Sequence, residues 1–396
     1  MVNKRNKILI LGAGRQQIPL ISTAIKMQLE VHVCSILGDY PGIEIAPYFH
    51  EVDISDSKAV LELAKSIEIQ GIITTGTDVC LESIGLVIDR LNLPGTCLES
   101  SKSCLNKTLM KARFSRFNVP TANYALIDSV ESGTEFFNSQ ISACVIKPAD
   151  SSGSRGVNRI EMGTEIHAAL VDARKYSASG EIIIEEWLEG EEFGAQAIII
   201  DGKLEKLMLH SDITTPPPRR IPIGHGCPHP AESELMPMVW SIVEHAVSAL
   251  GIDNTISNID FILTEDGPKI IEMTSRMGGT HLPEVCGTFW GIDMYETALQ
   301  IALGMQPVLP ESPLGVPNAI QNLIFDQPGK VAKLGDTNQE FVWNLYFGVG
   351  DYVVLNAAKQ AELGYVQDTT SDVGSLLQSV TNAAEAFCNT TEYEVD

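Results

Sequence analysis

Residues 257–276, SNIDFILTEDGPKIIEMTSR, say more about the fold of this 396-residue chain than any other stretch. Two apolar runs, Ser257–Leu263 and Pro268–Thr274, flank the residues Glu-Asp-Gly at 265–267, which form a good turn sequence. The stretch therefore predicts a β-hairpin whose two strands pair around this turn.

Each strand of the hairpin carries one acidic residue, Asp260 or Glu272, and the turn would bring the two together. Two carboxylates that lie close repel each other unless a cation lies between them, and Mg²⁺ favours carboxylate and phosphate oxygens. Arg276, two positions beyond Thr274, could neutralise a phosphoryl group or hold a substrate carboxylate with two hydrogen bonds. The pattern points to a site for Mg²⁺ and phosphate at the end of the hairpin.

A second chemical signal is the run KPADSSGSRGV at 147–157. Lys147 ends an apolar strand, and the glycine and serine amides after it can wrap phosphate oxygens while the lysine supplies a fixed positive charge. The run is not a Walker loop, because it lacks a Gly-Lys-Ser/Thr triplet and no helix follows directly. An ordinary surface loop is the structural alternative.

A third signal is the run EEWLEGEEF at 185–193, between two expected strands. Most of these glutamates suit a solvated acidic loop. One of them could instead accept both hydroxyls of a ribose, while the backbone at the strand end pairs with adenine.

The first hundred residues alternate between strand and helix patterns. Strands are predicted at Lys7–Leu11, Glu30–Cys34 and Gly71–Thr75, and helices at Pro19–Met27, Ser57–Ile67 and Val79–Leu91. This alternation predicts a parallel sheet covered on both faces, with ligands at the carboxyl ends of its strands, near 12–17 and 74–78.

After Lys102 the pattern becomes that of an α+β domain with an antiparallel sheet. Closely spaced strands are predicted at 143–147, 157–160, 181–188, 193–200 and 203–209, with one helix near 164–176 and another at Glu232–Leu250. The last ninety residues contain several glycine and proline breaks and suggest a small terminal domain.

Composition favours a small-molecule enzyme of the cytoplasm. The net charge of −24 repels a phosphate backbone, so no nucleic-acid partner is expected. The apolar runs are too short for a membrane span or a signal peptide. The eight cysteines are scattered without metal-ligand spacing, as is typical of reduced thiols.

The order of these motifs resembles that of the ATP-grasp carboxylate–amine ligases. This group includes biotin carboxylase-like, phosphoribosylamine–glycine ligase-like and L-amino-acid ligase-like proteins. The resemblance covers roughly residues 7–305. It implies an ATP-grasp fold of three parts: a Rossmann-like domain (1–103), an ATP-grasp domain (104–305) with a mobile lid at about 115–200, and a small C-terminal domain (306–396).

The resemblance also assigns residues to ATP. Contacts to its phosphates fall to two lysines and to the lid loop: Lys107, Lys147, Ser152, Gly153, Ser154 and Gly156. Adenine is expected to rest on a hinge of four residues, and the ribose on one glutamate: Glu185, Glu186, Trp187, Leu188 and Glu192.

The resemblance further implies Mg²⁺, or Mn²⁺ in its place, on Asp260 and Glu272, with Arg276 beside the reacting phosphoryl group. The family usually has asparagine two residues after the second metal glutamate, where this chain has Thr274. A threonine hydroxyl can coordinate Mg²⁺ or hold a metal-bound water, so Thr274 is expected as the third ligand.

The implied reaction uses ATP to convert a carboxylate into an acyl phosphate, which an amine then attacks to give an amide, ADP and phosphate. Arg276, Lys147 and His225 are the expected catalytic residues. His225 follows a proline-rich segment similar to one in ligases of this group, and a structural histidine is the alternative. With His281 and Glu284 near the acceptor pocket, an amino acid is the favoured substrate. Many such ligases are homodimers.

Three alternatives accompany this prediction. One is a phosphoribosylamine–glycine ligase-like enzyme of purine-type metabolism. Another is a non-catalytic nucleotide-binding protein, which loss of Asp260, Glu272 or Lys147 would have signalled. A nicotinamide-dependent oxidoreductase would rest only on the Gly-Ala-Gly run at 12–14, where Gln17 stands in place of the third glycine of a full fingerprint.

Overall fold

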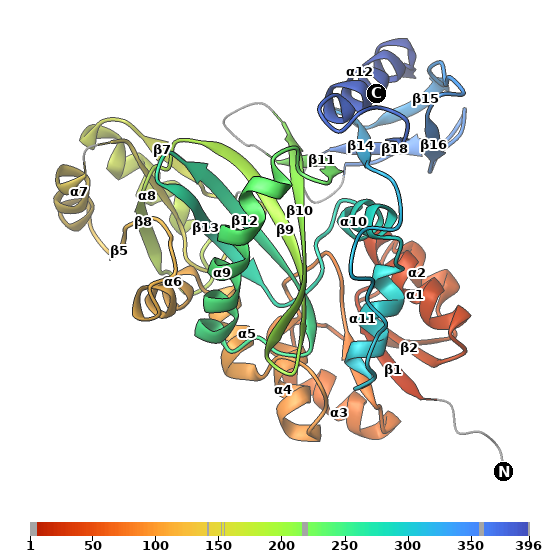
Figure 1. Cartoon of the computed structure of the whole chain (residues 1–396), viewed down its shortest axis with the longest axis horizontal. Coiled ribbons are helices and arrows are strands. Elements are labelled where there is room, and N and C mark those ends of the chain that lie inside the picture. Colours follow the sequence, from red (N-terminus) through yellow and green to blue (C-terminus); the bar gives the residue numbers. More distant parts are fainter. Residues whose placement is uncertain are drawn as a thin grey trace. The chain divides into compact units, whose positions relative to one another are not determined.

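The computed structural model describes residues 6–140, 142–151, 153, 155–215, 221–355 and 360–394 (Figure 1). It divides into two compact units. The first comprises Met1–Leu207, Ser233–Gly279 and Met294–Leu309, and the second comprises Met208–Glu232, Thr280–Asp293 and Pro310–Asp396. No helix among the described residues has the length and apolar character needed to cross a membrane.

The first unit opens with the predicted parallel sheet. Its strands follow the order β3-β2-β1-β4: Tyr48–Glu51, Glu30–Ser35, Lys7–Leu11 and Gly71–Ile73. The helices that accompany it are α1 (Ile18–Lys26), α2 (Pro41–Ile45), α3 (Ser57–Ile67) and α4 (Leu81–Leu91). Successive residues of β1 face opposite sides and all of Ile8–Leu11 are buried, so both faces of the sheet are covered. Helix α3 begins after Asp56, whose carboxylate accepts from the backbone N–H groups of Lys58 and Ala59.

A second, antiparallel sheet follows the connecting helices α5 (Leu98–Leu105) and α6 (Lys107–Arg116). Its strand order is β5-β8-β6-β7: Tyr124–Ile127, Ile182–Glu186, Cys144–Pro148 and Asn158–Ile160. Helices α7 (Val130–Ser139) and α8 (Ile166–Arg174) cover it, and Ile146, Ile184 and Ile166 meet in their shared core. The first unit also contains two short 3₁₀ helices, at Arg15–Gln17 and Gly163–Glu165.

The hairpin deduced from residues 257–276 is present as β12 (Thr255–Thr264) and β13 (Gly267–Thr274), with β9 (Glu191–Ile200) on the other side of β12. Gly267 has φ +107°, a conformation that side-chain-bearing residues rarely adopt, so a glycine is required directly after the turn. Helices α9 (Glu232–Leu250) and α11 (Met294–Ala302) also belong to this unit.

The second unit is built on antiparallel strands. Strand β10 (Lys203–Thr214) enters it at Met208, and the order continues as β11 (Pro222–Cys227), β14 (Asn318–Phe325), β18 (Ala361–Asp368) and β16 (Val342–Leu345). A small sheet pairs β15 (Gly329–Lys333) with β17 (Tyr352–Val353) and β19 (Glu392–Glu394). Helices α10 (Leu282–Trp290) and α12 (Leu376–Thr390) complete the unit, and Leu376, Val380 and Phe387 of α12 lie in its core.

The mixture of one parallel sheet with antiparallel sheets confirms the predicted fold class. The predicted domain bounds at 103/104 and 305/306 remain predictions.

Candidate active site

Asp260 on β12 lies directly opposite Glu272 on β13 in the hairpin. Opposed residues on an antiparallel pair have Cβ atoms about 4.5–5.5 Å apart, so the two carboxylates share one small space. The strand register shifts between Asp260 and Phe261. Irregularities of this kind re-aim side chains and are common beside active sites.

A chain of amide hydrogen bonds orients Asp260. Asn258 Nδ2 donates to Asp260 Oδ1 at 3.0 Å, and Gln196 Nε2 donates to Asn258 Oδ1 at 2.5 Å. Gln196 is fully buried on β9, and its Oε1 accepts from the backbone N–H of Gly278 at 3.0 Å. The carboxylate of Asp260 is therefore held in place by groups that are themselves fixed.

Lys107 brings a positive charge to the same carboxylates. It is the first residue of α6, follows the N-cap Asn106 and is buried. Its Nζ lies 3.3 Å from Glu272 Oε1 and donates to the backbone oxygen of Ser151 at 2.7 Å. A single side chain thus connects the hairpin with the serine- and glycine-rich loop.

Lys147, at the end of β6, shares a buried carboxylate with a second lysine. Glu185 Oε1 lies 3.0 Å from Lys147 Nζ, and Glu185 Oε2 lies 3.3 Å from the Nζ of Lys111, which also donates to Thr121 Oγ1 at 2.8 Å. Burial by itself would raise the pKa of Glu185, but the two lysines outweigh it and hold that pKa below its usual range. Burial lowers the pKa of Lys111 to about 8. Glu185 is therefore charged, and it holds Lys147 in position.

The loop after β6 contains a glycine, Gly153, whose backbone is not covered by other parts of the described chain. No heavy atom would lie within 4 Å of a Cβ added at Gly153, whereas Gly156 is buried against Tyr176 and Pro148. The carboxylate of Asp150 accepts from Ser177 Oγ at 2.8 Å and from the backbone N–H of Ser179 at 2.6 Å, which secures the start of the loop. Ser152 and Ser154, both predicted to bind phosphate, lie outside the described residues.

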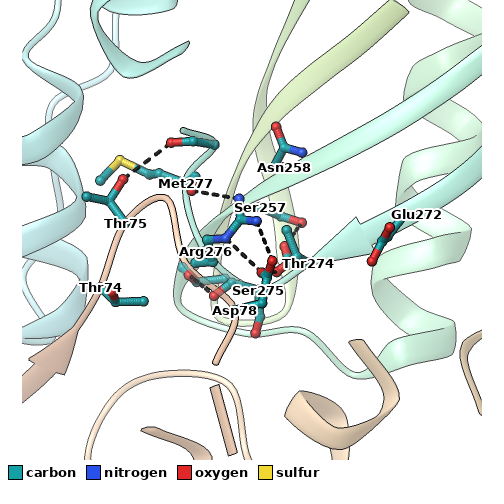
Figure 2. A network of polar contacts seen from close by, with 12 residues as sticks. Thr74, Thr75, Asp78, Ser257, Asn258, Glu272, Thr274, Ser275, Arg276 and Met277 are labelled. Atoms are coloured by element: carbon teal, nitrogen blue, oxygen red, sulfur yellow. Dashed lines mark hydrogen bonds and ion pairs between the residues drawn. The ribbon is translucent and has the colours of Figure 1, made fainter. Parts of the chain in front are cut away.

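Arg276 makes a two-pronged ion pair with a residue that the sequence did not single out (Figure 2). Its Nε and Nη2 donate to Asp78 Oδ1 and Oδ2, each at 2.8 Å, and Nη1 donates to the backbone oxygen of Met277 at 3.0 Å. Thr274 Oγ1 donates to Asp78 Oδ1 at 2.9 Å. Burial alone would raise the pKa of Asp78, but Arg276 and Thr274 lower it overall. The guanidinium and this hydroxyl therefore already have a protein partner.

The comparisons with known proteins fit this geometry. Residues 105–281 match the family model described as the phosphoribosylglycinamide synthetase ATP-grasp (A) domain. This match identifies an ATP-grasp domain in that part of the chain. It is 29% identical over 254 residues to the phosphoribosylamine–glycine ligase of Lactococcus lactis, a match that spans 60% of this chain and 58% of that ligase.

Two solved structures share the fold along nearly the whole chain. The phosphoribosylglycinamide synthetase of Anaerococcus prevotii has a TM-score of 0.79 at 22% identity, covering 99% of this chain and 100% of that one. The L-amino acid ligase of Bacillus licheniformis has a TM-score of 0.78 at 18% identity, with the same coverage. At these identities the structures show a common ATP-grasp fold and no common substrate.

The predicted adenine hinge of the ATP-grasp domain joins β8 to β9. Glu186 accepts from Asn123 N and Nδ2, at 3.1 and 2.9 Å, and lies 3.5 Å from Lys269 Nζ. The guanidinium carbon of Arg159 lies 4.5 Å from the ring centroid of Trp187, in a cation–π contact. Leu188 is half-buried, as is Glu192, which pairs with Ile262 of β12. These contacts fix the hinge side chains, and their roles toward ATP remain predictions.

Three other predicted residues, His225, His281 and Glu284, lie in the second unit. His225 is buried on β11, and its Nδ1 lies 2.6 Å from Asp212 Oδ1. His281 Nδ1 lies 3.9 Å from Glu284 Oε1, and its Nε2 lies 3.3 Å from the hydroxyl of Tyr346.

The glycine turn at 12–14 has a structural explanation. Gly12 has φ +97°, and the side chain of Gln17 packs within 3.2 Å of where a Cβ would stand. Gln17 Nε2 also donates to the backbone oxygen of Thr75 at 2.5 Å. A side chain therefore fills the space that the third glycine of a dinucleotide fingerprint leaves open.

Sequence reasoning missed Asp78, Lys111 and Gln196. Only Asp78 left a signal, because it falls in the segment 74–78 that was expected to bind ligands at the end of a parallel strand. Lys111 lies on a helix and Gln196 on a strand, and both side chains are buried. No local sequence pattern indicates that burial.

Proposed function

We propose that this protein transfers the γ-phosphate of ATP to a substrate carboxylate and joins the resulting acyl phosphate to an amine, with an amino acid as one substrate. The observation that carries this proposal is that Asp260 and Glu272 lie opposite each other on one hairpin. The Nζ of Lys107 lies 3.3 Å from Glu272 Oε1. Two acidic groups and a buried lysine suit a metal–triphosphate complex, whose charges complement both.

The residues fit Mg²⁺ because its preferred ligands are oxygens and Asp260 is already oriented by Asn258. Bound there with Glu272, and with Thr274 as the proposed third ligand, Mg²⁺ or Mn²⁺ would neutralise phosphate oxygens. Lys107 and Lys147 would hold the phosphates, and the open backbone at Gly153 would approach them. Catalysis of the first step would then come from positioning and charge neutralisation.

An amino-acid substrate is supported by the name of one relative, since the Lactococcus protein is a phosphoribosylamine–glycine ligase and glycine is an amino acid. However, Asp78 already accepts hydrogen bonds from both Nε and Nη2 of Arg276. Arg276 could therefore donate two hydrogen bonds to a substrate carboxylate from these atoms only after Asp78 had moved. Under this proposal, Arg276 does not bind the substrate carboxylate directly. Its positive charge stabilises the negative charge on the nearby reacting groups.

A phosphoribosylamine–glycine ligase-like reaction is the second candidate, because the ATP-grasp domain matches that family model. Such an enzyme needs basic residues for a ribose phosphate. Arg219 and Arg220, the pair that the sequence offers, lie outside the described residues.

The deciding experiment measures ADP release from Mg²⁺-ATP against free amino acids, singly and in pairs, with phosphoribosylamine plus glycine as a separate arm. An amino-acid pair that triggers ADP release and yields an amide by mass spectrometry supports the first proposal. Release only with phosphoribosylamine and glycine supports the second. ATP binding without turnover in any arm would contradict both and indicate a nucleotide-binding protein.

A further inference from the structure

Two lysines of the first unit share one buried carboxylate. Lys147 lies on β6, Glu185 lies on the neighbouring strand β8, and Lys111 lies on helix α6. Each oxygen of Glu185 faces one lysine, with Oε1 3.0 Å from Lys147 Nζ and Oε2 3.3 Å from Lys111 Nζ. Lys111 is fully buried, and at most 7% of either of the other two side chains is exposed. One buried negative charge therefore serves two buried positive charges.

The alternation of residues along the strands places these charges on one face of the sheet. Ile146 of β6 and Ile184 of β8 lie in the core that α7 and α8 cover. Lys147 and Glu185 come one position later on each strand, so they lie on the opposite face. Tyr124 of β5 pairs with Glu185 on that face, and its ring centroid lies 6.0 Å from Lys111 Nζ. Helix α6 therefore brings Lys111 to a carboxylate that the apolar core does not enclose.

The two lysines are held in different ways. Lys111 also donates to Thr121 Oγ1 at 2.8 Å, and Thr121 Oγ1 donates to the backbone oxygen of Ile270 at 2.7 Å. Glu185 Oε1, on the Lys147 side, accepts no well-directed hydrogen bond from any residue that the structure describes. The attraction between opposite charges is therefore what holds Lys147 to Glu185. Lys147 is the lysine that can change partners, and it stands directly before the loop that contains Gly153.

Moving Lys147 from Glu185 to a phosphate breaks a buried ion pair. Breaking such a pair is strongly unfavourable when it leaves a charge uncompensated in the interior. Here Glu185 retains a cation, because Lys111 lies 3.3 Å from its other oxygen. The three side chains also carry one excess positive charge when all are ionised, which favours the arrival of an anion.

We propose that Lys111 is a positioning residue for nucleotide binding, which continues to neutralise Glu185 when Lys147 leaves that carboxylate for the phosphates of ATP. This inference rests on the proposed function, in which Lys147 holds those phosphates. The phosphates take up the excess positive charge, and Glu185 keeps one buried cation before and after binding. Lys111 thus acts on ATP affinity through Glu185 and Lys147.

The test compares ATP with adenosine, which lacks the phosphates. Calorimetric titration at pH 7 measures the dissociation constants of Mg²⁺-ATP and adenosine, and Lys111 is charged at this pH because burial lowers its pKa only to about 8. Lys111→Met should weaken Mg²⁺-ATP binding at least about tenfold, since Lys147 must then stay on Glu185. Adenosine binding requires no release of Lys147, so its dissociation constant should stay within about twofold of the wild-type value.

A second comparison uses Glu185→Gln, which removes the carboxylate that Lys111 neutralises. In that background Lys147 has no carboxylate to leave, so adding Lys111→Met should change the Mg²⁺-ATP dissociation constant by less than about twofold. The double variant replaces the ion pair with two neutral side chains, so it keeps the inference testable if Lys111→Met alone does not fold. The matched control is Lys102→Met, an exposed lysine of α5 that lies 3.3 Å from Glu82 and should leave the binding of both ligands unchanged.

Several results would overturn the inference. Equal weakening of ATP and adenosine binding in Lys111→Met would indicate a purely structural role. Wild-type affinity for Mg²⁺-ATP in Lys111→Met, or in Lys147→Met, would show that no lysine is handed over. A tenfold loss on adding Lys111→Met to Glu185→Gln would show that Lys111 acts by another route. A wild-type protein that binds no Mg²⁺-ATP would instead overturn the proposed function.

Discussion

Glu272 opposes Asp260 across the hairpin and forms an ion pair with Lys107. We predict that Glu272→Gln lowers ADP formation about 100-fold, since the Mg²⁺ that would neutralise the phosphate loses one of its proposed charged ligands. Steady-state kinetics over a range of Mg²⁺ concentrations measures this. Glu265→Gln, an exposed glutamate of the same hairpin, is the matched control and should keep the wild-type rate. Equal rates in the two variants would remove Glu272 from the site.

The ion pair between Asp78 and Arg276 supports a prediction about stability. Asp78→Asn should lower the free energy of unfolding by about 3 kcal/mol at pH 7, because Arg276 loses its partner while only 13% of its side chain is exposed. The folded-state pKa of Asp78 is lowered, so its contribution is complete above the unfolded pKa of about 3.9 and is lost as the pH falls through the folded value. Urea unfolding at pH 7 and pH 3 should therefore show a smaller difference at pH 3.

At the scale of elements, we expect the turn between β12 and β13 to be sensitive to substitution. Gly267→Ala should destabilise the protein by about 1–2 kcal/mol, because φ is +107° and the new Cβ would lie 3.1 Å from Met238 Sδ. Gly163→Ala is the control, since its φ is outside the left-handed region and its nearest neighbour would lie 3.9 Å away. Urea unfolding of both variants tests this, and similar losses would contradict the strain argument.

Elements with strong local signals could be predicted from the sequence. The bounds of β1, α3 and α9 agree with the prediction, because buried apolar runs and an Asp56 cap mark them. Strands β3 and β5 were missed. Each has four residues, and the burial pattern of β3, Tyr48–Glu51, has no fully buried position. Their strand conformation comes from pairing with a neighbour, which no local pattern records.

The site was predictable to the extent that it is local. Asp260 and Glu272 are twelve residues apart on one hairpin, so a turn sequence sufficed to pair them. Asp78 and Arg276 are separated by 198 positions and Lys107 and Glu272 by 165, so these pairs exist only through the packing of distant elements. The same holds for the burial that joins Lys111 to Glu185.

For the molecule as a whole, nucleotide binding should change amide hydrogen exchange and thermal stability beyond the residues that contact the ligand. If the region of about 115–200 is a lid, Mg²⁺-ATP should slow amide hydrogen exchange in β6 and β8, whereas the parallel strands β1 and β2 should change little. At 100 times its dissociation constant, the nucleotide should also stabilise the protein by about 2.7 kcal/mol, seen as a rise in Tm. Unchanged exchange in β6 and β8 despite a raised Tm would show binding without lid closure.

The two lysines proposed to bind phosphate already have carboxylate partners, Lys107 with Glu272 and Lys147 with Glu185. A simple anion such as sulfate must compete with these carboxylates and should bind weakly. A cation that took over Glu272 would release Lys107 for the triphosphate, so metal and nucleotide would each strengthen the binding of the other by the same factor. Selectivity for the complete Mg²⁺-ATP complex would then arise from this mutual dependence, because the metal would engage Glu272 and the triphosphate would engage the Lys107 that Glu272 releases.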